Sequence, residues 1–597
     1  MHQTINAVNE STANGLARLA RFFGFSDIMG RLYGTLLLSP EPMSLDDLCD
    51  RLQISKGSVS MTMRDLERWG MAKEVWVRGE RRKYYKAESD MWQVIRNVLS
   101  GREQREVQLA LHVLGESVEK LQAAECQLSP EEQQLARYYL DRIADLQASV
   151  PGLRLKTDPA DLEHYGRDWT RRWTPAPLAI ALPGNVEEVQ SIVRWAKANA
   201  VAIVPSGGRT GLSGGAVAAN GELVVSLERM NQVLGFDAID RTLTVQAGIP
   251  LQLAQEAARS HGLQYPVDFA ARGSCSIGGN IATNAGGIRV VRYGNTREWI
   301  AGLKLVTGDG ELLDVGRSLV KNSSGYDLRH LAIASEGTLG IVVEATLKLT
   351  DPPPPTNVML LALPSFDALM QVFDAFRARL PLQAFEFLTD RALHHVLAHG
   401  AQAPFAETHP YYVVTEFASD EGSETEALAA FEQCMEAGLV SDGVISQSDA
   451  QAAQLWRLRE GITESLAKHV PYKNDISVRL SAMPAFLAET QALLGEAYPH
   501  FDVVWFGHIG DGNLHINVLK PDGMAQTDFV ADCDRVTKLL AERLHAHGGS
   551  ISAEHGIGLV KKPYLSSTRS ATEIATMRGI KAVLDPAGIM NPGKLFD

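Results

Sequence analysis

PSGGRTGLSGGAV, residues 205–217, is the stretch of sequence that most constrains the fold. It follows an apolar, strand-like run at residues 201–204 and precedes another at residues 223–227. A glycine-rich loop between two strands can turn a row of backbone N–H groups toward an anion, because no side chain blocks the approach. It lacks the Gly-Lys-Ser/Thr ending of a Walker loop and the glycine spacing of a dinucleotide-binding helix start. Taken alone, the stretch also fits a tight turn in a β-rich domain.

Three further stretches accompany this loop. They are PVDFAARGSCSIGGNIATNAGG at residues 266–287, ASEGTLGIVVEATLKL at 334–349 and NPGKLF at 591–596. Together, in this order, the four stretches resemble the FAD-binding domain of the vanillyl-alcohol-oxidase superfamily. The resemblance is to its D-2-hydroxy-acid dehydrogenase branch, which includes the flavin-binding component of glycolate oxidase and the D-lactate and D-2-hydroxyglutarate dehydrogenases. It covers the chain from about residue 140 and implies an α+β PCMH-type FAD-binding domain followed by an α+β FAD-oxidase C-terminal domain.

The resemblance implies that these four stretches hold FAD. The first would bind the pyrophosphate, the second the isoalloxazine and ribityl chain, and the third the adenine side, while the fourth would close the site. Some relatives carry a histidine in the first loop for covalent attachment, but this chain has Arg209-Thr210 there, which favours noncovalent FAD. The implied FAD-binding residues are Pro205, Ser206, Gly207, Gly208, Arg209, Thr210, Gly211, Leu212, Ser213, Gly214, Pro266, Asp268, Gly273, Ser274, Ile277, Gly278, Gly279, Asn280, Thr283, Asn284, Gly286, Gly287, Glu336, Gly337, Gly340, Ile341, Val342, Asn591 and Lys594.

A second group of polar residues lies near the C-terminus. VVWFGHIGDGNLHINV, residues 503–518, reads as strand, glycine loop and strand, so His515 and Asn517 share one face and His508 lies in the loop. ISAEHGIG, residues 551–558, adds Glu554 and His555. Two histidines and a carboxylate suit a divalent metal such as zinc, although histidines in such places are also often structural. The resemblance implies that His508, His515 and Glu554 bind the metal, Asn517 binds substrate and His555 is the general base.

Substrate anions need cations, and LWRLREGITESLAKHVPYKNDIS, residues 455–477, supplies them. Arg459 and Thr463 lie four residues apart on a predicted helix and so on one face, and Lys473 follows in an extended segment. The resemblance implies that these three residues bind the substrate carboxylate, Arg459 through a bidentate fork. A solvated helix face is the alternative interpretation of Arg459.

These residues predict a reaction. A D-2-hydroxy acid of the D-lactate, D-2-hydroxyglutarate or glycolate type would lose its hydroxyl proton to His555 and its α-hydrogen, as hydride, to the flavin N5, giving the 2-oxo acid. The five cysteines (Cys49, Cys126, Cys275, Cys434, Cys533) lack the short spacing of iron–sulfur ligands. We therefore expect a separate electron acceptor: a quinone, an electron-transfer flavoprotein or a partner subunit.

Residues 42–89 have a different character. MSLDDLCDRLQ and ISKGSVSMTMRDLERWG predict two helices, capped by Ser44 and Ser55, and Gly70 ends the second. The more polar side of the second helix presents Lys56, Ser58, Ser60, Thr62 and Arg64. AKEVWV and RRKYYKA then predict a hairpin around Gly79-Glu80. Residues 51–90 contain 10 basic and 6 acidic residues, whereas the whole chain has a net charge of −14.

This order resembles winged-helix transcription regulators of the MarR and GbsR type over about residues 10–125. The resemblance implies an all-α winged helix-turn-helix unit that binds DNA as a homodimer, paired through a long helical stretch at residues 90–125. The residues expected to contact DNA are Lys56, Ser58, Ser60, Arg64, Arg81 and Arg82. The alternative is a module for protein interaction or dimerisation only. At the level of the whole chain, a dehydrogenase that also regulates genes competes with a regulator whose enzyme-like domain senses a ligand or redox state.

The expected organisation is therefore a multidomain fusion of 597 residues. We expect the winged helix at residues 1–125, a linker and the start of the flavoenzyme at 126–171, the FAD-binding domain at 172–351 and the substrate and metal domain at 352–597. DPPPPT, residues 351–356, marks the last boundary, and about residues 585–597 return to the FAD site. No apolar run reaches the length of a membrane-spanning helix and the N-terminus lacks a signal-peptide pattern, which predicts a cytoplasmic protein.

Overall fold

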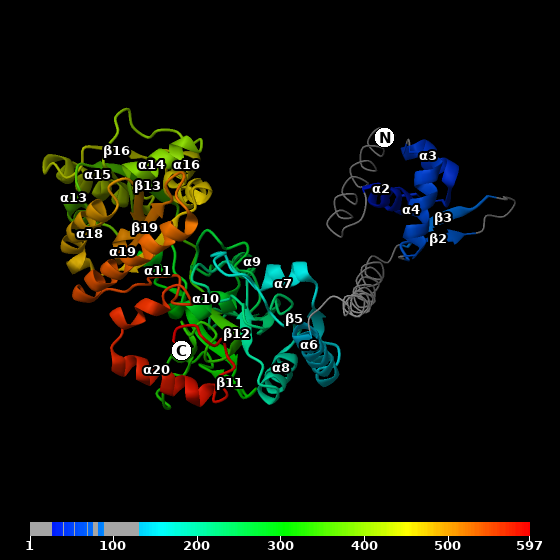
Figure 1. The fold of residues 1–597 in the computed structure, drawn as a ribbon. Coiled ribbons are helices and arrows are strands. Elements are labelled where there is room, and N and C mark those ends of the chain that lie inside the picture. The colour runs from blue at the N-terminus through cyan, green and yellow to red at the C-terminus, as the bar shows by residue number, and fades with distance from the viewer. Residues whose placement is uncertain are drawn as a thin grey trace. The chain divides into compact units, whose positions relative to one another are not determined.

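The computed structural model describes residues 27–39, 41–52, 54–68, 70–75, 82–88 and 130–596 (Figure 1). Arg81 and the helical stretch expected at residues 90–125 lie outside these ranges. The chain separates into two compact units between Gln133 and Gln134. None of the helices in the described ranges combines the length and the apolar character that a membrane crossing requires.

The described part of the N-terminal unit contains three helices and a small sheet. Its elements are α2 (Asp27–Leu37), β1 (Met43–Ser44), α3 (Leu45–Leu52), α4 (Lys56–Arg68), β2 (Ala72–Val75) and β3 (Tyr84–Ala87). The strands are antiparallel in the order β1-β3-β2. The Ser55 hydroxyl accepts a hydrogen bond from the Ser58 N–H at 3.3 Å, and Gly70 ends α4 with a φ of +65°.

Two expectations for this unit were wrong. The unit is not all-α, because Met43–Ser44 pairs with β3 and adds a third strand to the hairpin. Thr62, which the helix pattern placed on the polar side of α4, is buried at 8% exposure beside the core residues Val59 and Met63. Arg64 remains exposed on this helix and Ser58 and Ser60 are half-buried.

The second unit begins with a small sheet that carries the first glycine loop. Its elements are α6 (Pro130–Ser149), β4 (Arg154–Lys156), α7 (Pro159–Tyr165), β5 (Ala179–Leu182), α8 (Val186–Ala198), β6 (Ile203–Ser206) and β7 (Leu223–Ser226). The strand order is β4-β5-β7-β6, with β5, β7 and β6 parallel. The glycine loop leaves β6 at its carboxyl end, the edge at which ligands usually bind in parallel sheets.

A five-stranded antiparallel sheet of order β11-β10-β12-β9-β8 packs into the same hydrophobic core. Its strands are β8 (Val233–Asp237), β9 (Thr242–Gln246), β10 (Ile300–Val306), β11 (Leu312–Val315) and β12 (Ile341–Lys348). The helices of this part are α9 (Leu251–Ser260), α10 (Ile277–Thr283), α11 (Val290–Tyr293), η1 (Thr296–Trp299) and α12 (Arg329–Ala332).

After the proline segment comes a seven-stranded sheet of order β16-β13-β15-β14-β18-β19-β17. Its strands are β13 (Thr356–Leu363), β14 (Ala384–Thr389), β15 (Tyr411–Ala418), β16 (Asp442–Ile445), β17 (Tyr472–Ser477), β18 (Asp502–Gly507) and β19 (Asn513–Leu519). The helices are α13 (Phe366–Arg377), α14 (Asp390–Ala398), α15 (Glu421–Glu436), α16 (Asp449–Glu460), α17 (Ile462–Leu466), η2 (Ala467–His469), η3 (Leu480–Ala482), α18 (Met483–Ala497), η4 (Ile509–Asp511), α19 (Gln526–Ala546), η5 (Lys562–Ser567) and α20 (Ala571–Leu584).

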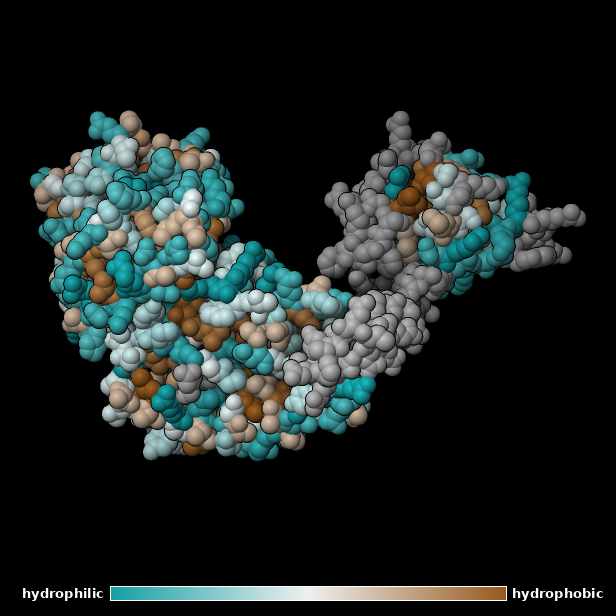
Figure 2. All heavy atoms as spheres, viewed as in Figure 1, coloured by the Kyte–Doolittle hydropathy of each residue, from teal (hydrophilic) through white to brown (hydrophobic). Residues whose placement is uncertain are grey.

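The two faces of this sheet have separate cores. One face packs against α13, α15, α18 and α19, and the other against α14, α16 and α17. The chain then returns to the first sheet, where Met590 bridges Ile203 and the Asn591 N–H donates to the Ile203 carbonyl at 2.8 Å. The visible face of the second unit is largely hydrophilic with dispersed apolar residues (Figure 2), because most large apolar side chains lie in these cores.

Candidate active site

The polar cluster near the C-terminus lies on one face of the seven-stranded sheet. Across β17 and β19, Asp475 lies opposite His515 and Lys473 opposite Asn517. Directly opposed residues of an antiparallel pair project to the same side, so these four side chains share a face. Phe506 of β18 lies opposite His515 and packs into the core beneath α16 and α17.

A tight loop brings His508 to the same place. It runs from β18 through η4 to β19, and Gly512 closes it with a φ of +87°. A Cβ atom on Gly512 would lie 2.2 Å from the Val478 carbonyl oxygen, so glycine is required. The imidazole rings of His508 and His515 consequently lie 5.3 Å apart, nearly perpendicular.

Glu554 completes a candidate metal site. Its Oε1 lies 3.5 Å from His508 Nε2 and its Oε2 lies 4.0 Å from His515 Nε2. One ligand atom from each of these three residues lies within 4.8 Å of the others. Two imidazole nitrogens and a carboxylate oxygen at this spacing fit a catalytic zinc site, which keeps a coordination position for substrate.

Burial and charge set the protonation of this cluster. Burial raises the pKa of Glu554 to about 7, against the attraction of His508. Burial alone would lower the pKa of His508, but Glu386 and Glu554 raise it to about 9. Burial holds the pKa of His515 well below its usual value. A divalent cation among these groups would compensate the buried negative charge of Glu554.

Asp475 fixes the segment that carries His555. Its Oδ2 accepts hydrogen bonds from the backbone N–H groups of Glu554 and His555, both at 3.0 Å, and lies 3.3 Å from His555 Nδ1. Lys561 Nζ donates to the Asp475 carbonyl at 3.1 Å. Burial alone would raise the pKa of Asp475, but His555, Lys561 and His515 hold it well below its usual value. Burial lowers the pKa of His555 to about 4, which leaves a neutral imidazole able to accept a proton.

Two cations border the cluster. Arg459 is 6% exposed, and its guanidinium lies 4.8 Å from the Phe506 ring centroid. Its buried Nε and Nη2 have no hydrogen-bond partner among the described residues. Lys473 is half-buried, and burial lowers its pKa. A buried cation with a free donor suits an anionic substrate group.

One expectation for this part was wrong. Arg459 and Thr463 do not lie on one uninterrupted helix, because α16 ends at Glu460 and α17 begins at Ile462. Gly461, a weak helix former, lies at the break. Thr463 is exposed on α17, whereas Arg459 is buried at the end of α16.

The first two glycine stretches pack directly against each other. A Cβ atom on Gly207 would lie 2.1 Å from Ser276 Oγ, and one on Gly208 would lie 1.9 Å from the Ser274 carbonyl. Gly214 does not offer its N–H to a ligand, because Asp168 accepts that hydrogen bond at 2.8 Å. Gly207 and Gly208 thus bring the backbone of the first stretch directly against the second.

The second stretch continues to the metal site. Ser276 caps α10, which holds Ile277, Gly278, Gly279, Asn280 and Thr283, and Asn284 ends it in the left-handed conformation with a φ of 51°. A Cβ atom on Gly286 would lie 3.5 Å from Glu554 Oε1, and one on Gly287 only 2.0 Å from the Asp268 carbonyl. The stretch expected to line the flavin therefore adjoins a candidate metal ligand.

The third and fourth stretches connect the glycine loop with the His555 segment. The Glu336 carboxylate accepts from the N–H groups of Ile557 at 2.7 Å and Gly558 at 2.8 Å. Asn591 Nδ2 donates to the Gly215 and Glu336 carbonyls, and Lys594 Nζ donates to the Val217 carbonyl at 2.8 Å. The Ser213 hydroxyl donates to the His555 carbonyl at 2.8 Å. The amide of Asn591 and the ammonium of Lys594 thus hold the loop in place.

Comparisons with known proteins agree with this architecture. A family described as FAD binding domain matches residues 177–316, and one described as FAD linked oxidases, C-terminal domain, matches residues 352–595. The D-2-hydroxyglutarate dehydrogenase of Xanthomonas citri pv. viticola is 80% identical over 457 residues, which cover 76% of this chain and 97% of that protein. The D-2-hydroxyglutarate dehydrogenase of Stutzerimonas stutzeri is 53% identical over 456 residues, covering 76% and 98%.

The chain belongs to the FAD-linked D-2-hydroxy-acid dehydrogenases. Among solved structures, 4-ethylphenol oxidase from Gulosibacter chungangensis covers 77% of this chain and 97% of its own, with a TM-score of 0.61 at 18% identity. That likeness shows the PCMH-type FAD-binding and FAD-oxidase C-terminal fold. The dehydrogenase therefore uses FAD to oxidise a D-2-hydroxy acid, as its sequence motifs predict.

Sequence reasoning missed several buried groups of this dehydrogenase. Glu386 lies in the apolar strand β14, and Asp475 and Lys561 form a buried ion pair at 3.5 Å. Asp168 was likewise not expected to cap the Gly214 amide. A carboxylate inside a fully buried strand, as in AFEFLT at residues 384–389, is the signal that identifies Glu386.

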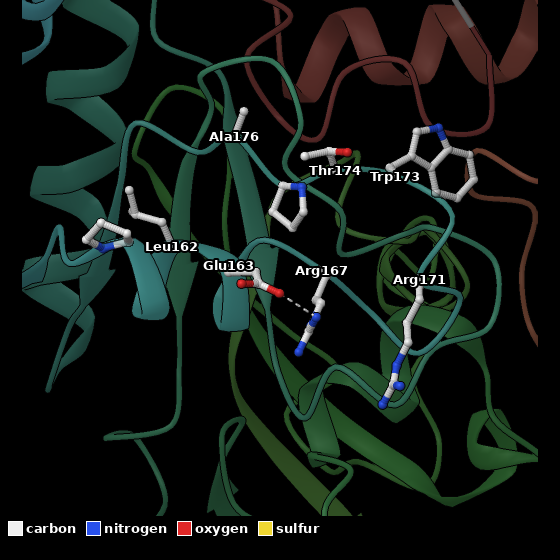
Figure 3. Close-up of a pocket in the computed structure, with 9 residues that line it drawn as sticks. Leu162, Glu163, Arg167, Arg171, Trp173, Thr174 and Ala176 are labelled. Atoms are coloured by element: carbon white, nitrogen blue, oxygen red, sulfur yellow. Dashed lines mark hydrogen bonds and ion pairs between the residues drawn. The ribbon is translucent and has the colours of Figure 1, made fainter.

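The dehydrogenase also has a cavity of about 500 Å³ beside the glycine loop (Figure 3). The cavity lies between α7 and the segment that follows α7. This segment contacts the glycine loop, because the backbone N–H of Trp169 donates to the Gly211 carbonyl at 3.1 Å. Its lining residues are Pro159, Leu162, Glu163, Arg167, Arg171, Trp173, Thr174, Pro175 and Ala176. Arg167 pairs with Glu163 at 2.9 Å, and the histidine cluster is not part of this lining.

Proposed function

We propose that this dehydrogenase oxidises D-2-hydroxyglutarate to 2-oxoglutarate. The observation that carries the proposal is the placement of two cations, Arg459 and Lys473, beside the cluster of His508, His515 and Glu554. A dicarboxylic acid needs one positive region for each carboxylate. A bound metal would provide one of these regions, and the two cationic side chains would provide the other. The names of the relatives that are 80% and 53% identical support the same substrate.

The metal and the flavin have distinct places in this proposal. His508, His515 and Glu554 would hold a divalent metal, for which zinc suits the donor set. When bound, such an ion lowers the pKa of a substrate hydroxyl, and noncovalent FAD supplies the hydride acceptor. The four glycine-rich stretches would hold FAD through the residues that the family resemblance implies, with the Asn591 and Lys594 side chains fixing the loop rather than the cofactor.

The remaining site residues act on the substrate. Arg459 and Lys473, with Thr463 from α17, would bind one carboxylate and so orient the α-carbon. Asn517, directly opposite Lys473 on β19, would hold the reacting end through its amide. His555 accepts the hydroxyl proton, and the Asp475 carboxylate at 3.3 Å stabilises the imidazolium that forms.

Anaerobic flavin bleaching tests the substrate. We expect D-2-hydroxyglutarate to bleach the flavin of the purified protein at least tenfold faster, at equal concentration, than D-lactate, glycolate or L-2-hydroxyglutarate. His515→Ala or removal of the metal by a chelator should abolish the bleaching, and zinc should restore it only in the wild type. Faster bleaching by D-lactate would refute the proposed substrate, and a colourless or inert protein would refute the proposed activity.

The reduced flavin needs an oxidant outside this chain. A quinone, an electron-transfer flavoprotein or a partner subunit would serve, since the four cysteines of the described part (Cys49, Cys275, Cys434 and Cys533) are free thiols far apart in sequence. Turnover with purified electron-transfer flavoprotein, compared with a soluble quinone, distinguishes the first two acceptors. Turnover with neither would point to a partner subunit.

For the N-terminal unit we propose DNA binding by a winged helix, as a dimer. The order helix, strand, two helices and hairpin, with the sheet order β1-β3-β2, supports it, as do the exposed Arg64 and Arg82. Arg82 lies 3.8 Å from Asp46, and both side chains are exposed. Such an ion pair contributes little stability, so Arg82 could bind a DNA phosphate in place of Asp46 at little cost. The expected contacts are Lys56, Ser58, Ser60, Arg64, Arg81 and Arg82.

A mobility-shift titration with the promoter fragment of its own gene tests this second proposal. We expect a salt-sensitive shift that weakens at least tenfold in the Arg81→Ala, Arg82→Ala double variant. No shift at low salt would instead support a protein-interaction module. Catalytic turnover by the same preparation would argue against a regulator that retains the enzyme-like part only as a sensor.

A further inference from the structure

Glu386 is a buried carboxylate that the proposed mechanism does not use. It is 1% exposed in β14, between Phe385 and Phe387, which are also buried. Burying a carboxylate is costly unless its oxygens are paired. Here Oε1 lies 2.7 Å from His508 Nδ1, within hydrogen-bond distance. Oε2 forms an ion pair with Arg459 Nη2 at 2.8 Å, although neither of these two atoms makes a hydrogen bond among the described residues.

We infer that Glu386 is a positioning residue that joins the metal ligand His508 and the carboxylate-binding Arg459 into one rigid unit. The inference rests on the proposed function, because it takes the roles of His508 and Arg459 from it. It adds that a single carboxylate orients both ends of the substrate site. Loss of Glu386 should therefore weaken metal binding and carboxylate binding together.

The contact with His508 determines which ring nitrogen binds the metal. A histidine that donates its Nδ1 proton to a carboxylate keeps the lone pair of Nε2 free as a ligand. His508 Nε2 is the nitrogen that lies 3.5 Å from Glu554 Oε1, on the side of the candidate metal site. Glu386 therefore fixes both the tautomer and the rotation of the ring.

The contact with Arg459 fixes the guanidinium. Arg459 is held between Glu386 and the Phe506 ring, 4.8 Å from its centroid, and its buried Nε remains without a partner in the described part of the chain. An arginine that is already oriented loses less side-chain entropy when it binds a substrate carboxylate. Without Glu386, this long side chain would have to be ordered by the substrate itself.

The same face of the sheet provides a matched control. Glu416 of β15 is 2% exposed and pairs with Arg289 at 3.1 Å, and it lies directly opposite Ala384, two residues before Glu386. Glu416 also accepts a hydrogen bond from the Thr356 hydroxyl at 2.6 Å. Glu416→Gln therefore disturbs a buried glutamate–arginine pair without touching His508 or Arg459.

The experiment compares Glu386→Gln, Glu386→Asp and Glu416→Gln with the wild type as full-length, FAD-loaded proteins. The zinc dissociation constant is measured by competition with a chromophoric chelator. The 2-oxoglutarate dissociation constant is measured from the change in flavin absorbance of the zinc-loaded protein. The midpoint of thermal unfolding reports the structural cost of each change.

Glu386→Gln should raise the zinc dissociation constant about 10- to 100-fold, as is typical when a partner of a metal-bound histidine is lost. It should also raise the 2-oxoglutarate dissociation constant about tenfold or more, because an amide holds the Arg459 guanidinium in its binding orientation less firmly than a carboxylate does. Glu386→Asp retains the charge but is one methylene shorter, so both constants should rise less. In Glu416→Gln both constants should stay within threefold of the wild type even if the unfolding midpoint falls.

An unchanged zinc or 2-oxoglutarate constant in Glu386→Gln overturns the inference, as do equal losses in Glu416→Gln. If Glu386→Gln does not fold, Glu386→Asp is judged by the same two constants. A wild type that does not bind zinc also overturns it. A wild type that binds zinc and 2-oxoglutarate but does not oxidise D-2-hydroxy acids refutes the proposed function alone.

Discussion

Asp475 illustrates how a single residue can organise several others. Its side chain receives two backbone N–H groups from the Glu554–His555 segment, and its Oδ1 accepts from Asn513 Nδ2 at 2.9 Å. Lys561, 6% exposed, supplies the compensating charge. Asp475 thus links β17 to the first residue of β19 and to the segment that carries the proposed base.

Asp475→Asn should therefore reduce the rate constant of flavin reduction about 10²- to 10⁴-fold. An amide cannot stabilise the imidazolium of His555, and its NH2 group would oppose one of the donors that now point to the carboxylate. Stopped-flow absorbance under anaerobic conditions measures the rate constant. Asp534→Asn removes a half-exposed carboxylate bound to the Tyr472 hydroxyl in the same domain and should leave the rate within threefold. Similar rates in both variants would contradict the prediction.

Glu336 predicts a pH dependence of stability. Burial raises its pKa to about 7, although the N–H groups of Ile557 and Gly558 and the charge of Lys561 lower it in part. The folded state then binds a proton more tightly than the unfolded state, whose glutamate titrates near 4.5. Stability should fall as the pH rises from about 4.5 to about 7, by about 3 kcal/mol from this group, and should then level off.

Thermal unfolding midpoints at pH 5, 6, 7 and 8 measure this effect against Glu336→Gln. The glutamine does not titrate, so the stability advantage of the wild type should shrink with rising pH up to about 7 and then stay constant. The variant should be less stable at pH 5, because its NH2 group cannot accept a hydrogen bond from the N–H that it faces, whereas both oxygens of the protonated carboxyl retain lone pairs that can. A difference that does not change with pH would contradict the prediction.

At the scale of elements, the loop between β18 and β19 sets the spacing of the candidate metal site. Strand, loop and strand were predictable from residues 503–518, because apolar runs flank a glycine-rich segment. The partners of these strands were not, since pairing of β19 with β17 depends on residues 40 positions away. For this reason the roles of Glu386 and Asp475 were not predicted. Only the pairing of strands distant in sequence places Glu386 beside His508 and Asp475 beside His555. The break at Gly461 was missed because one glycine in a helical pattern is often tolerated.

Gly512→Ala tests the loop. A Cβ atom there would lie 2.2 Å from the Val478 carbonyl, and the φ of +87° disfavours any L side chain. The loop must shift, so we expect the zinc content of the purified protein to fall below half of the wild-type value and activity to fall at least tenfold. Gly523→Ala has a similar φ of +79° but nothing within 4 Å of its Cβ. It should lose only about 1 kcal/mol of stability and retain its zinc. Full zinc content in Gly512→Ala would show that the loop tolerates the displacement.

At the scale of the whole molecule, the charge and the site residues divide between the two units. Residues 1–150 contain 19 basic and 21 acidic residues, so nearly all of the net charge of −14 belongs to the remaining residues. Every residue of the candidate active site lies after Gln134. The alignment with the relative that is 80% identical covers 97% of that protein and 76% of this chain. Nearly the whole length of that dehydrogenase therefore has a counterpart in this chain, and about a quarter of the chain lies outside the match.

A shortened protein that starts at Ser129 should accordingly keep its activity. The cut preserves α6, which begins at Pro130 and whose Ile143 and Leu146 contribute to the core of the FAD-binding part. We expect FAD content equal to that of the full chain and kcat/KM for D-2-hydroxyglutarate within threefold, because no residue of the proposed site is removed. The same shortened protein should give no mobility shift with promoter DNA at salt concentrations at which the full chain does. Loss of FAD on shortening would instead mean that the catalytic unit needs residues 1–128 to fold, and a retained shift would place the DNA contact outside them.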